Sequence, residues 1–351
     1  MHRTWTRAAD GVFRVGDSVV LRQKTNRDAS PIFCQKLVAG GRVNTSRGGI
    51  PHEDIIGRRA REVVRDHGKL SRAYRLHEAK LDEYVRWSRR KVTPLYPEDI
   101  QIILGLMDIH VDGDEAMEIL EAGTGHGALT LYLSRAVHRS GSGNGSKMPV
   151  IHSVERSAAY SAHAQSVVAG FRHGIYSSNI AFHVGCVSDW ISATLPLRDN
   201  RPFLAHSFLD LPNADQHLAR VAPALRVDGT LIVFNPSITQ ILECWTKVKK
   251  DSLPLELERV VELGVSAGSG GREWDVRAVR PRAELKMAAK GASGEQDEDA
   301  STLTHTTDNV CDPLRSSGWK MICRPKVGER IIGGGFVGVF RKTRDYLRPE
   351  D

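Results

Sequence analysis

From residue 117 to about residue 250, short apolar runs alternate with segments of helical periodicity. The apolar runs are MEILEAG (117–123), VIHSVE (150–155), IAFHVGCV (180–187), FLAHSFLD (203–210) and TLIVFNP (230–236). The helical segments are ALTLYLSRAVH (128–138), SAAYSAHAQSVVAGF (157–171), ADQHLARVAPAL (214–225) and ITQILECWTKV (238–248). Such alternation is typical of a parallel sheet covered on both faces. It predicts an α/β fold whose ligand binds at the carboxyl ends of the strands.

The flanking segments have different patterns. Residues 11 to about 50 contain short alternating runs bounded by Gly, Asn and Asp, which predict a small β-rich N-terminal module. The stretch 80–109 predicts a helix, an extended segment around Pro94 and a second helix that begins at Pro97. The stretch 321–342 alternates around a Gly-Glu turn and predicts a C-terminal antiparallel hairpin.

These patterns divide the chain into two predicted domains. Residues 1–80 form the β-rich module with a basic face, and residues 81–351 form the α/β domain. A polar, acidic insert at about 290–310 interrupts the second domain, and we expect it to be flexible because it has too few apolar residues to pack.

Composition limits the class of protein. With 351 residues, 40% of them hydrophobic, the chain is long enough for one large and one small core. It has no apolar run of membrane-spanning length and no secretory signal pattern, so we expect an intracellular protein. The five cysteines lack C-x-x-C spacing and the fourteen histidines form no ligand motif, so we predict no metal site.

The net charge of +7 is concentrated in one stretch. Between Arg58 and Lys91 there are twelve Lys/Arg residues and five Asp/Glu residues. Such clustering is expected of a surface that binds a polyanion such as RNA. A solvated helix with intrahelical ion pairs is the alternative interpretation.

A glycine loop follows the first apolar run of the α/β domain. Gly123, Gly125 and Gly127 let the backbone pass close to a ligand at a helix N-terminus. With Ala128 the loop also satisfies the G-x-G-x-x-A dinucleotide fingerprint, so NAD is one candidate ligand. Glu121 would repel a pyrophosphate, whereas S-adenosylmethionine has no phosphate and carries an ammonium group. The charge therefore favours S-adenosylmethionine.

Acids at the next two strand ends suit the same cofactor. Glu155 ends the second apolar run, where an acid can hold ribose hydroxyls. Asp189 follows the third run and is placed to accept a hydrogen bond from the adenine amino group. Each acid could instead cap a helix or lie on the surface.

Several motifs, in order, resemble the catalytic subunit of tRNA adenine-58 N1-methyltransferases, a class I S-adenosylmethionine-dependent family. They are RGGIPHEDIIGR (47–58), YPEDIQIIL (96–104), EILEAGTGHGALT (118–130), VERS (154–157) and FLDLPNADQHLARVAPALRVDGTLIVFNPSITQ (208–240). Three departures stand out, one of which is that the family's Gly-His-Thr-Gly stretch is not found after the late Arg-Pro in VRPRAELKMAAKGASGE (279–295). His126 occupies a position where the family usually has serine, and the Pro-Trp that normally follows D-L-P is missing after Pro212.

The resemblance implies a Rossmann-like class I methyltransferase sheet that binds S-adenosylmethionine. The expected cofactor-binding residues are Glu121, Gly123, Thr124, Gly125, Gly127, Ala128, Glu155, Arg156, Tyr160, Asp189 and Asp210. Asp210 of the LDLP motif is expected where the cofactor and the target adenine meet, and we expect it to accept a hydrogen bond from the adenine N6 group. Tyr96 is a second catalytic candidate, which would stack on or hydrogen-bond the extruded base, although a packing role is equally compatible with its position.

The implied partner is tRNA. The expected RNA-binding residues are Arg58, Arg59, Arg86, Arg89 and Arg90. Members of the family work as homotetramers or pair with a non-catalytic homologue, so we expect an oligomer of one of these kinds. The sequence does not distinguish a nuclear from a mitochondrial enzyme.

Other functions remain open at this point. A divergent paralogue could methylate another RNA. An NAD-dependent oxidoreductase could use the same glycine loop, but we find no set of His, Lys and Tyr residues suited to hydride transfer. A non-catalytic RNA-binding subunit would have no physical need for Glu121, Glu155, Asp189 and Asp210 together.

Overall fold

The computed structural model describes residues 11–26, 28–46, 48–111, 117–138, 148–264, 274–279, 320–325 and 334–344. The chain groups into two compact units, one within residues 1–265 and 332–351 and the other within residues 266–331. In the smaller unit, strands β13 (Trp274–Val279) and β14 (Lys320–Pro325) pair antiparallel. The predicted insert at about 290–310 lies outside the described residues, and the predicted boundary at residue 80 stays a prediction.

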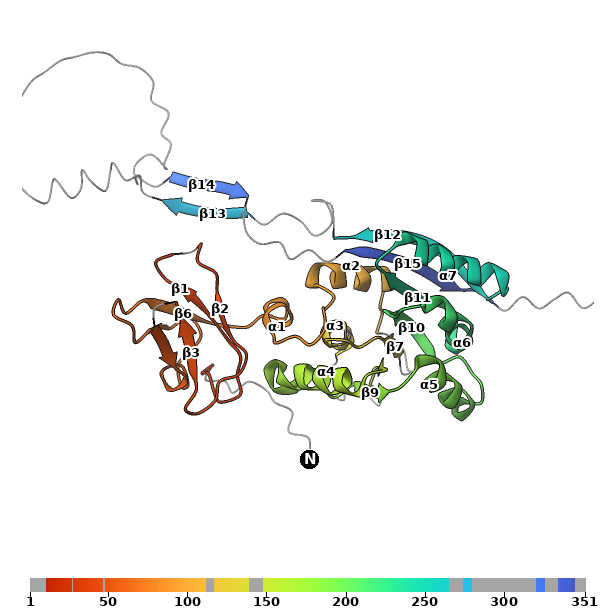
Figure 1. Ribbon diagram of the computed structural model, residues 1–351, viewed down its shortest axis with the longest axis horizontal. Helices are drawn as coiled ribbons and strands as arrows, with labels where there is room; N and C mark the ends of the chain where they lie inside the picture. Colours follow the sequence, from red (N-terminus) through yellow and green to blue (C-terminus); the bar gives the residue numbers. More distant parts are fainter. Residues whose placement is uncertain are drawn as a thin grey trace, which may run out of the picture. The chain divides into compact units, whose positions relative to one another are not determined.

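The larger unit contains a seven-stranded sheet with the order β12-β15-β11-β10-β7-β8-β9. Its strands are β7 (Glu118–Ala122), β8 (Val150–Glu155), β9 (Ile180–Val184), β10 (Leu204–Leu209), β11 (Leu225–Asn235), β12 (Leu255–Leu263) and β15 (Gly335–Lys342). Strands β7 to β11 run parallel, whereas β15 lies antiparallel between β11 and β12 (Figure 1). The chain leaves β7 for β8 and β9 on one side and returns to β10 on the other. The gap between β7 and β10 is therefore the topological switch point, where ligands of such sheets bind.

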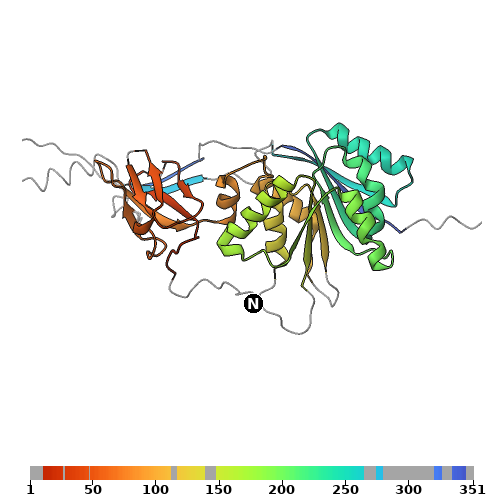
Figure 2. The same ribbon diagram turned by 60° about the horizontal axis from the view of Figure 1, so that its bottom comes forward.

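Helices cover both faces of this sheet (Figure 2). They are α1 (Leu81–Trp87), α2 (Pro97–Met107), α3 (Ala128–Val137), α4 (Ala158–Gly170), α5 (Val187–Thr194), α6 (Leu218–Ala224) and α7 (Ile238–Lys250), with short turns η2 (Phe171–Gly174), η3 (Pro196–Arg198) and η4 (Ala214–His217). Successive residues of β7 serve opposite faces: Ile119 packs with the core under α1 to α4, and Leu120 packs with the core under α5 to α7. This explains why the parallel strands read as continuous apolar runs. None of the described helices is both long and apolar enough to span a membrane.

The N-terminal module has two small sheets. Strands β1 (Val19–Gln23), β2 (Ile32–Cys34), β5 (Val63–Arg65) and β6 (Ala73–Glu78) form one sheet in the order β2-β1-β6-β5, and β3 (Arg42–Thr45) and β4 (Gly48–Pro51) form a hairpin that leads into the turn η1 (His52–Asp54). Val19 and Leu21 face the module's own core, whereas Val20 packs with the core of α1 to α4. The Tyr84 hydroxyl donates a hydrogen bond of 2.9 Å to the carbonyl oxygen of Val167 in α4.

The expected α/β architecture is confirmed, with omissions and one error. Helix α5 and strands β12 and β13 were not predicted. The predicted hairpin within 321–342 is wrong, because β14 pairs with β13 while β15 pairs with β11 and β12. A glycine-rich turn between two alternating runs predicts a hairpin from local signals alone, but here each run finds a partner far away in the sequence.

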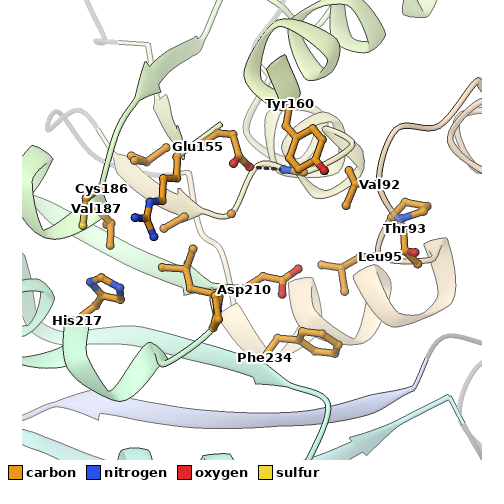
Figure 3. A pocket seen from close by; sticks show the side chains of 18 of the residues that line it. Val92, Thr93, Leu95, Glu155, Tyr160, Cys186, Val187, Asp210, His217 and Phe234 are labelled. Carbon is orange, nitrogen blue, oxygen red and sulfur yellow. Dashed lines mark hydrogen bonds between the residues drawn. The ribbon is translucent and has the colours of Figure 1, made fainter. Parts of the chain in front are cut away.

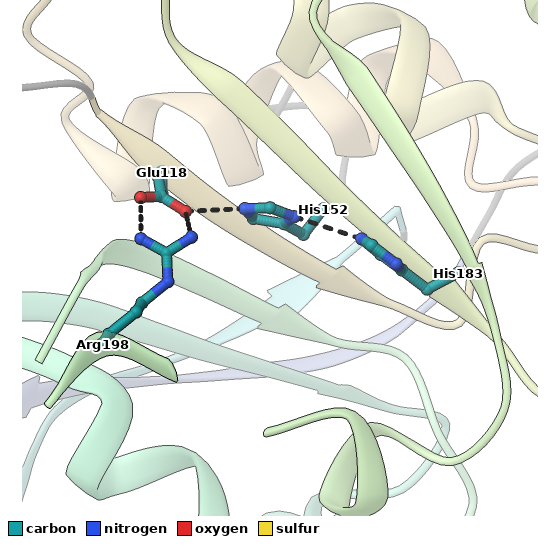
Figure 4. A network of polar contacts seen from close by, with 4 residues as sticks. All are labelled: Glu118, His152, His183 and Arg198. Atoms are coloured by element: carbon teal, nitrogen blue, oxygen red, sulfur yellow. Dashed lines mark hydrogen bonds and ion pairs between the residues drawn. The ribbon is translucent and has the colours of Figure 1, made fainter. Parts of the chain in front are cut away.

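A buried polar network joins β7, β8 and β9 on the side of the sheet where β7 begins (Figure 4). The Glu118 carboxylate accepts hydrogen bonds from Nη2 of Arg198 and Nε2 of His152, both at 2.7 Å, and Nδ1 of His152 lies 3.2 Å from Nε2 of His183. Burial opposes ionisation of Glu118, but the hydrogen bonds from His152 and Arg198 outweigh it and lower its pKa. The network links these strands on the side of the sheet opposite the predicted ligand site, which lies at the carboxyl ends of the strands.

Candidate active site

A cavity of about 830 Å³ opens at the carboxyl ends of β7, β8, β9 and β10 (Figure 3). Its wall comes from the segment before α2, the glycine loop, the end of β8, the start of α5, the segment after β10 and the end of β11. Its position at the switch point agrees with the ligand site predicted from the sequence. Of the predicted site residues, the cavity is lined by Tyr96, Gly123, Gly125, Glu155, Arg156, Tyr160 and Asp210.

The glycine loop packs tightly against the end of β10. Gly123 has a φ of +93°, and a Cβ atom there would lie 2.2 Å from the carbonyl oxygen of Asp210. The Asp210 amide donates a 2.9 Å hydrogen bond to the carbonyl of Ala122, and the Gly123 amide donates one of the same length to Val154. Only glycine fits position 123, because any side chain would push the two strand ends apart.

Glu155 is fixed at the end of β8 by backbone amides. Its Oε2 accepts a hydrogen bond of 3.0 Å from the Gly125 amide, shown dashed in Figure 3, and its Oε1 accepts one of 2.9 Å from the Ser157 amide. The side chain is only 8% exposed. Glu155 therefore ties the glycine loop to β8 and presents a preorganised carboxylate to the cavity.

Asp210 follows β10 and lies between His217 on one side of the cavity and Leu95 on the other in Figure 3. Burial raises the pKa of Asp210 to about 6, and the negative charge of Glu155 adds to the effect. A carboxylate in this setting ionises near neutral pH and gains most from a cation or hydrogen-bond donor placed beside it.

Tyr96 precedes α2 and is held by a neighbouring arginine. Its hydroxyl accepts a 3.3 Å hydrogen bond from Nη1 of Arg90, whose guanidinium carbon lies 5.6 Å from the centre of the ring. The side chain is 8% exposed and lines the cavity. Arg90 thus orients the Tyr96 side chain, which forms part of the cavity wall, in addition to carrying charge.

Glu121 and Thr124 lie behind the glycine loop and do not line the cavity. Glu121 Oε2 accepts hydrogen bonds of 2.6 Å from the hydroxyls of Thr130 and Ser153, and Thr124 Oγ1 lies 2.7 Å from Ser153 Oγ. Burial raises the pKa of Glu121 to about 7 despite these hydrogen bonds. The arrangement braces the loop from below, so direct contact of these two residues with a ligand stays a prediction.

Three other predicted cofactor residues also lie away from the wall. Gly127 begins α3 with a φ of +81° and packs against Ala164, and Ala128 is buried in the first turn. Asp189 is exposed in the first turn of α5. Sequence order placed Asp189 near a strand end, but as the third residue of α5 it does not line the cavity.

The cavity includes residues that the sequence patterns did not single out. They are Val92, Thr93, Pro94, Leu95, Asp99, Val154, Gly185, Cys186, Val187, Leu211, Pro212, His217, Phe234 and Gly334. The Pro-Glu-Asp helix start could have indicated Asp99, which is 3% exposed and whose pKa is raised by burial and by the charge of Glu98. His217 had no local signal, because it reaches the cavity only through the fold of η4.

The charges of the wall discriminate between the candidate ligands. Asp99, Glu155 and Asp210 contribute three carboxyl groups, and among the described residues Arg156 is the one arginine or lysine that lines the cavity. An acidic wall suits a ligand that carries a sulfonium and an ammonium group better than one with a pyrophosphate. The wall therefore fits S-adenosylmethionine and disfavours NAD. Within the described part of the chain, no group of three or more His, Cys, Asp and Glu residues is arranged to hold a metal ion.

The predicted RNA-binding arginines differ in whether their side chains already interact with other residues of the protein. Arg58 pairs with Glu62 at 3.5 Å and Arg86 with Glu98 at 2.5 Å, while Arg90 contacts Tyr96. Arg59 and Arg89 are exposed. Exposed pairs such as Arg58–Glu62 are weak, so a phosphate could replace the carboxylate.

Comparisons with known proteins identify relatives of this chain. Residues 11–64 match the family model described as TrmI-like N-terminal. The chain is 33% identical over 238 residues to tRNA (adenine(58)-N(1))-methyltransferase TrmI of Thermus thermophilus, which covers 68% of this chain and 81% of that protein. A shorter match of 66 residues, 41% identical, links it to tRNA (adenine(57)-N(1)/adenine(58)-N(1))-methyltransferase TrmI of Methanocaldococcus jannaschii, with 19% and 22% of the two chains covered.

Solved structures share the fold. An S-adenosylmethionine-dependent O-methyltransferase from Thermotoga maritima superposes with a TM-score of 0.63 at 16% identity over 100% of both chains. The tRNA (m1A58) methyltransferase TrmI of Aquifex aeolicus superposes with a TM-score of 0.59 at 15% identity over 95% of this chain and 100% of that one. Because the Thermus relative is one third identical over four fifths of its length, this chain belongs to the TrmI family of tRNA (adenine(58)-N(1))-methyltransferases.

Proposed function

We propose that this protein transfers a methyl group from S-adenosylmethionine to N1 of adenine 58 in the T loop of tRNA. Family membership supports the reaction, and one observation carries its assignment to this cavity. Asp210 stands at the switch point, beside the glycine loop and in an acidic wall. A carboxylate there can hold the amino group of an adenine that enters from the side of Leu95 and Phe234.

The protein's part in the reaction is to align groups and to stabilise charge. When bound, S-adenosylmethionine supplies an electrophilic methyl group, and the nucleophile is the lone pair of adenine N1, so no nucleophilic side chain is required. As N1 accepts the methyl group, positive charge spreads to the adenine N6 amino group. Asp210 accepts a hydrogen bond from that group, which strengthens as the charge develops and so lowers the barrier.

The remaining residues form the binding site of the cofactor and the binding site of the target adenine. Glu155, fixed by the amides of Gly125 and Ser157, accepts hydrogen bonds from ribose hydroxyls. Tyr96, oriented by Arg90, offers its ring to a base that has left the stack of the T loop. Leu95 and Phe234 supply apolar surface on the same side of the cavity.

Transfer of labelled methyl groups to two tRNA transcripts tests this function. One transcript carries adenine at position 58 and the other guanine, whose N1 bears a proton and has no free lone pair. Digestion and mass spectrometry should find 1-methyladenosine only in the first. Equal labelling of both transcripts, or none with S-adenosylmethionine binding intact, would contradict the assignment of position 58.

We further propose that the protein acts as an oligomer, either a homotetramer or a complex with a non-catalytic homologous subunit. A single chain of this size would cover only part of a folded tRNA. Light scattering on purified protein distinguishes the forms: a homotetramer has four times the mass of the chain, and a stable monomer that methylates tRNA alone would contradict both.

A further inference from the structure

His217 closes one side of the cavity although it follows the stretch that departs from the family pattern. It is the last residue of η4 and lines the cavity together with Cys186 and Val187 from the start of α5. Figure 3 shows these three residues on the side away from Leu95 and Phe234. The missing Pro-Trp therefore coincides with a segment that brings a polar ring to the wall.

The ring of His217 is oriented by a neighbour. Its Nδ1 lies 2.7 Å from the hydroxyl oxygen of Ser188, so this nitrogen is already engaged and Nε2 is the polar atom left for a ligand. Burial lowers the pKa of His217, while the charges of Asp215 and Asp189 oppose the effect. The imidazole is therefore neutral near pH 7. When Nδ1–H donates to Ser188, Nε2 is a hydrogen-bond acceptor.

The order of groups along the cavity indicates which part of the cofactor reaches His217. Asp210 follows β10, the glycine loop follows β7, Glu155 ends β8, and Gly185 to Val187 follow β9. With methyl transfer at Asp210 and the ribose at Glu155, the base comes to the β9 side. There Val187 and Leu211 offer apolar surface, and His217 is the polar side chain beside them.

Asp189 was predicted to accept from the adenine amino group, but it is exposed and does not line the cavity. Its charge acts on His217. We propose that His217, held by Ser188, accepts a hydrogen bond from the 6-amino group of the cofactor's adenine and so selects adenine at this end of the cavity. This inference rests on the proposed function, because it takes S-adenosylmethionine as the cofactor.

Calorimetric binding of two ligands to the full-length protein tests the proposal. One ligand is S-adenosylhomocysteine, and the other is its 6-deamino analogue, in which purine replaces adenine. A hydrogen bond of this kind contributes about 0.5–1.5 kcal/mol, so the wild type should prefer the amino compound by roughly 2- to 12-fold. His217→Ala should bind both equally, and His217→Asn, whose amide oxygen can accept, should regain part of the preference.

Two further variants distinguish a direct role of His217 in binding adenine from a general effect on the structure of this region. Ser188→Ala removes the group that orients the ring and should reduce the preference. Asp189→Asn should keep it. Retention of the full preference by His217→Ala, or its loss in Asp189→Asn alone, would overturn the proposal. A wild type that binds S-adenosylhomocysteine with no preference refutes only the role of His217, whereas one that does not bind it at all refutes the cofactor assignment and the proposal together.

Discussion

Asp210 is the residue whose ionisation should control the rate. Its pKa is raised to about 6 by burial and by Glu155, and only the ionised form carries the negative charge that stabilises the positive charge developing on the adenine amino group. We expect methyl transfer under single-turnover conditions to fall as the pH drops below about 6, or below a lower value if a bound cation stabilises the carboxylate. Asp210→Asn should be slower by about 100-fold and should lose this inflection. A variant that keeps the wild-type pH profile would assign the titration to another group.

Glu121 should make the folded state less stable as the pH rises. Its pKa is about 7 in the folded protein and near 4.5 when unfolded, so the unfolded chain ionises first. Between these two values the folded state loses up to roughly 3 kcal/mol relative to a residue that does not titrate.

Urea unfolding of Glu121→Gln and wild type at pH 5 and pH 8 measures this effect. The variant should gain stability relative to the wild type on going to pH 8, whatever the offset at pH 5. Glu256→Gln, on the exposed surface of β12, is the control and should run parallel to the wild type. If the stability of Glu121→Gln instead changes between pH 5 and pH 8 by the same amount as that of the wild type, burial of the Glu121 charge costs little.

At the residue scale, the sequence predicted Glu155 and Asp210 at the cavity for a physical reason. The carboxyl ends of parallel strands meet at one edge of the sheet, so acids that end or follow successive strands converge there. Glu121 lies one residue before a strand end, and the alternation of side chains turns it toward Thr130 of α3. A local pattern marks the helix start at Asp99 but not that this turn faces the cavity, and His217 comes from a segment whose path depends on tertiary packing.

At the element scale, the contact between the glycine loop and the end of β10 should be intolerant of any side chain. Gly123→Ala places a Cβ against the Asp210 carbonyl at a φ of +93°, and strain of this kind costs about 1–3 kcal/mol before the clash is counted. We expect a lower melting temperature and loss of S-adenosylhomocysteine binding.

Gly105→Ala is the matched control, because a Cβ there meets nothing within 4 Å and the residue lies inside α2. It should stabilise the protein by about 0.5–1 kcal/mol through helix propensity alone. If both variants bind the ligand normally, the close approach of the two strand ends is not required for the site.

The elements missed by sequence patterns lacked signals of their own. Helix α5 has only eight residues, and Cys186 at its N-cap makes no side-chain capping bond, so nothing marks where it begins. Strand β12 carries four charged residues among its nine, as suits the edge of a sheet. By contrast, α2 begins with Pro97 followed by two acids, and its prediction is confirmed.

At the scale of the whole molecule, the basic stretch from Arg58 to Lys91 should provide a salt-dependent grip on tRNA. Arg90 is unsuitable as a probe because it also orients Tyr96. Arg89→Glu combined with Lys91→Glu changes two exposed side chains, and the affinity for tRNA should fall by about tenfold or more, with a shallower dependence on salt. Affinity measured by filter binding at several salt concentrations gives both quantities.

The control pair is Arg220→Glu with Arg259→Glu, which changes the net charge equally on exposed positions of α6 and β12. It should weaken binding much less. Equal losses for the two pairs would mean that total charge governs binding and that the basic stretch has no special role. Cofactor affinity should stay unchanged in both pairs.

The position of β15 governs how the chain can be completed during its synthesis. Among the described strands of this sheet β15 is made last, yet it lies between β11 and β12, so β12 pairs with none of the others until residues 335–342 have been made. Until then the long edge of β11 is open to other chains, which makes this interval the most prone to aggregation. Leu263 pairs with Gly335, so segment 264–334 leaves and re-enters the sheet at one point. Changes in the length of that segment can therefore accumulate without disturbing the register of the sheet.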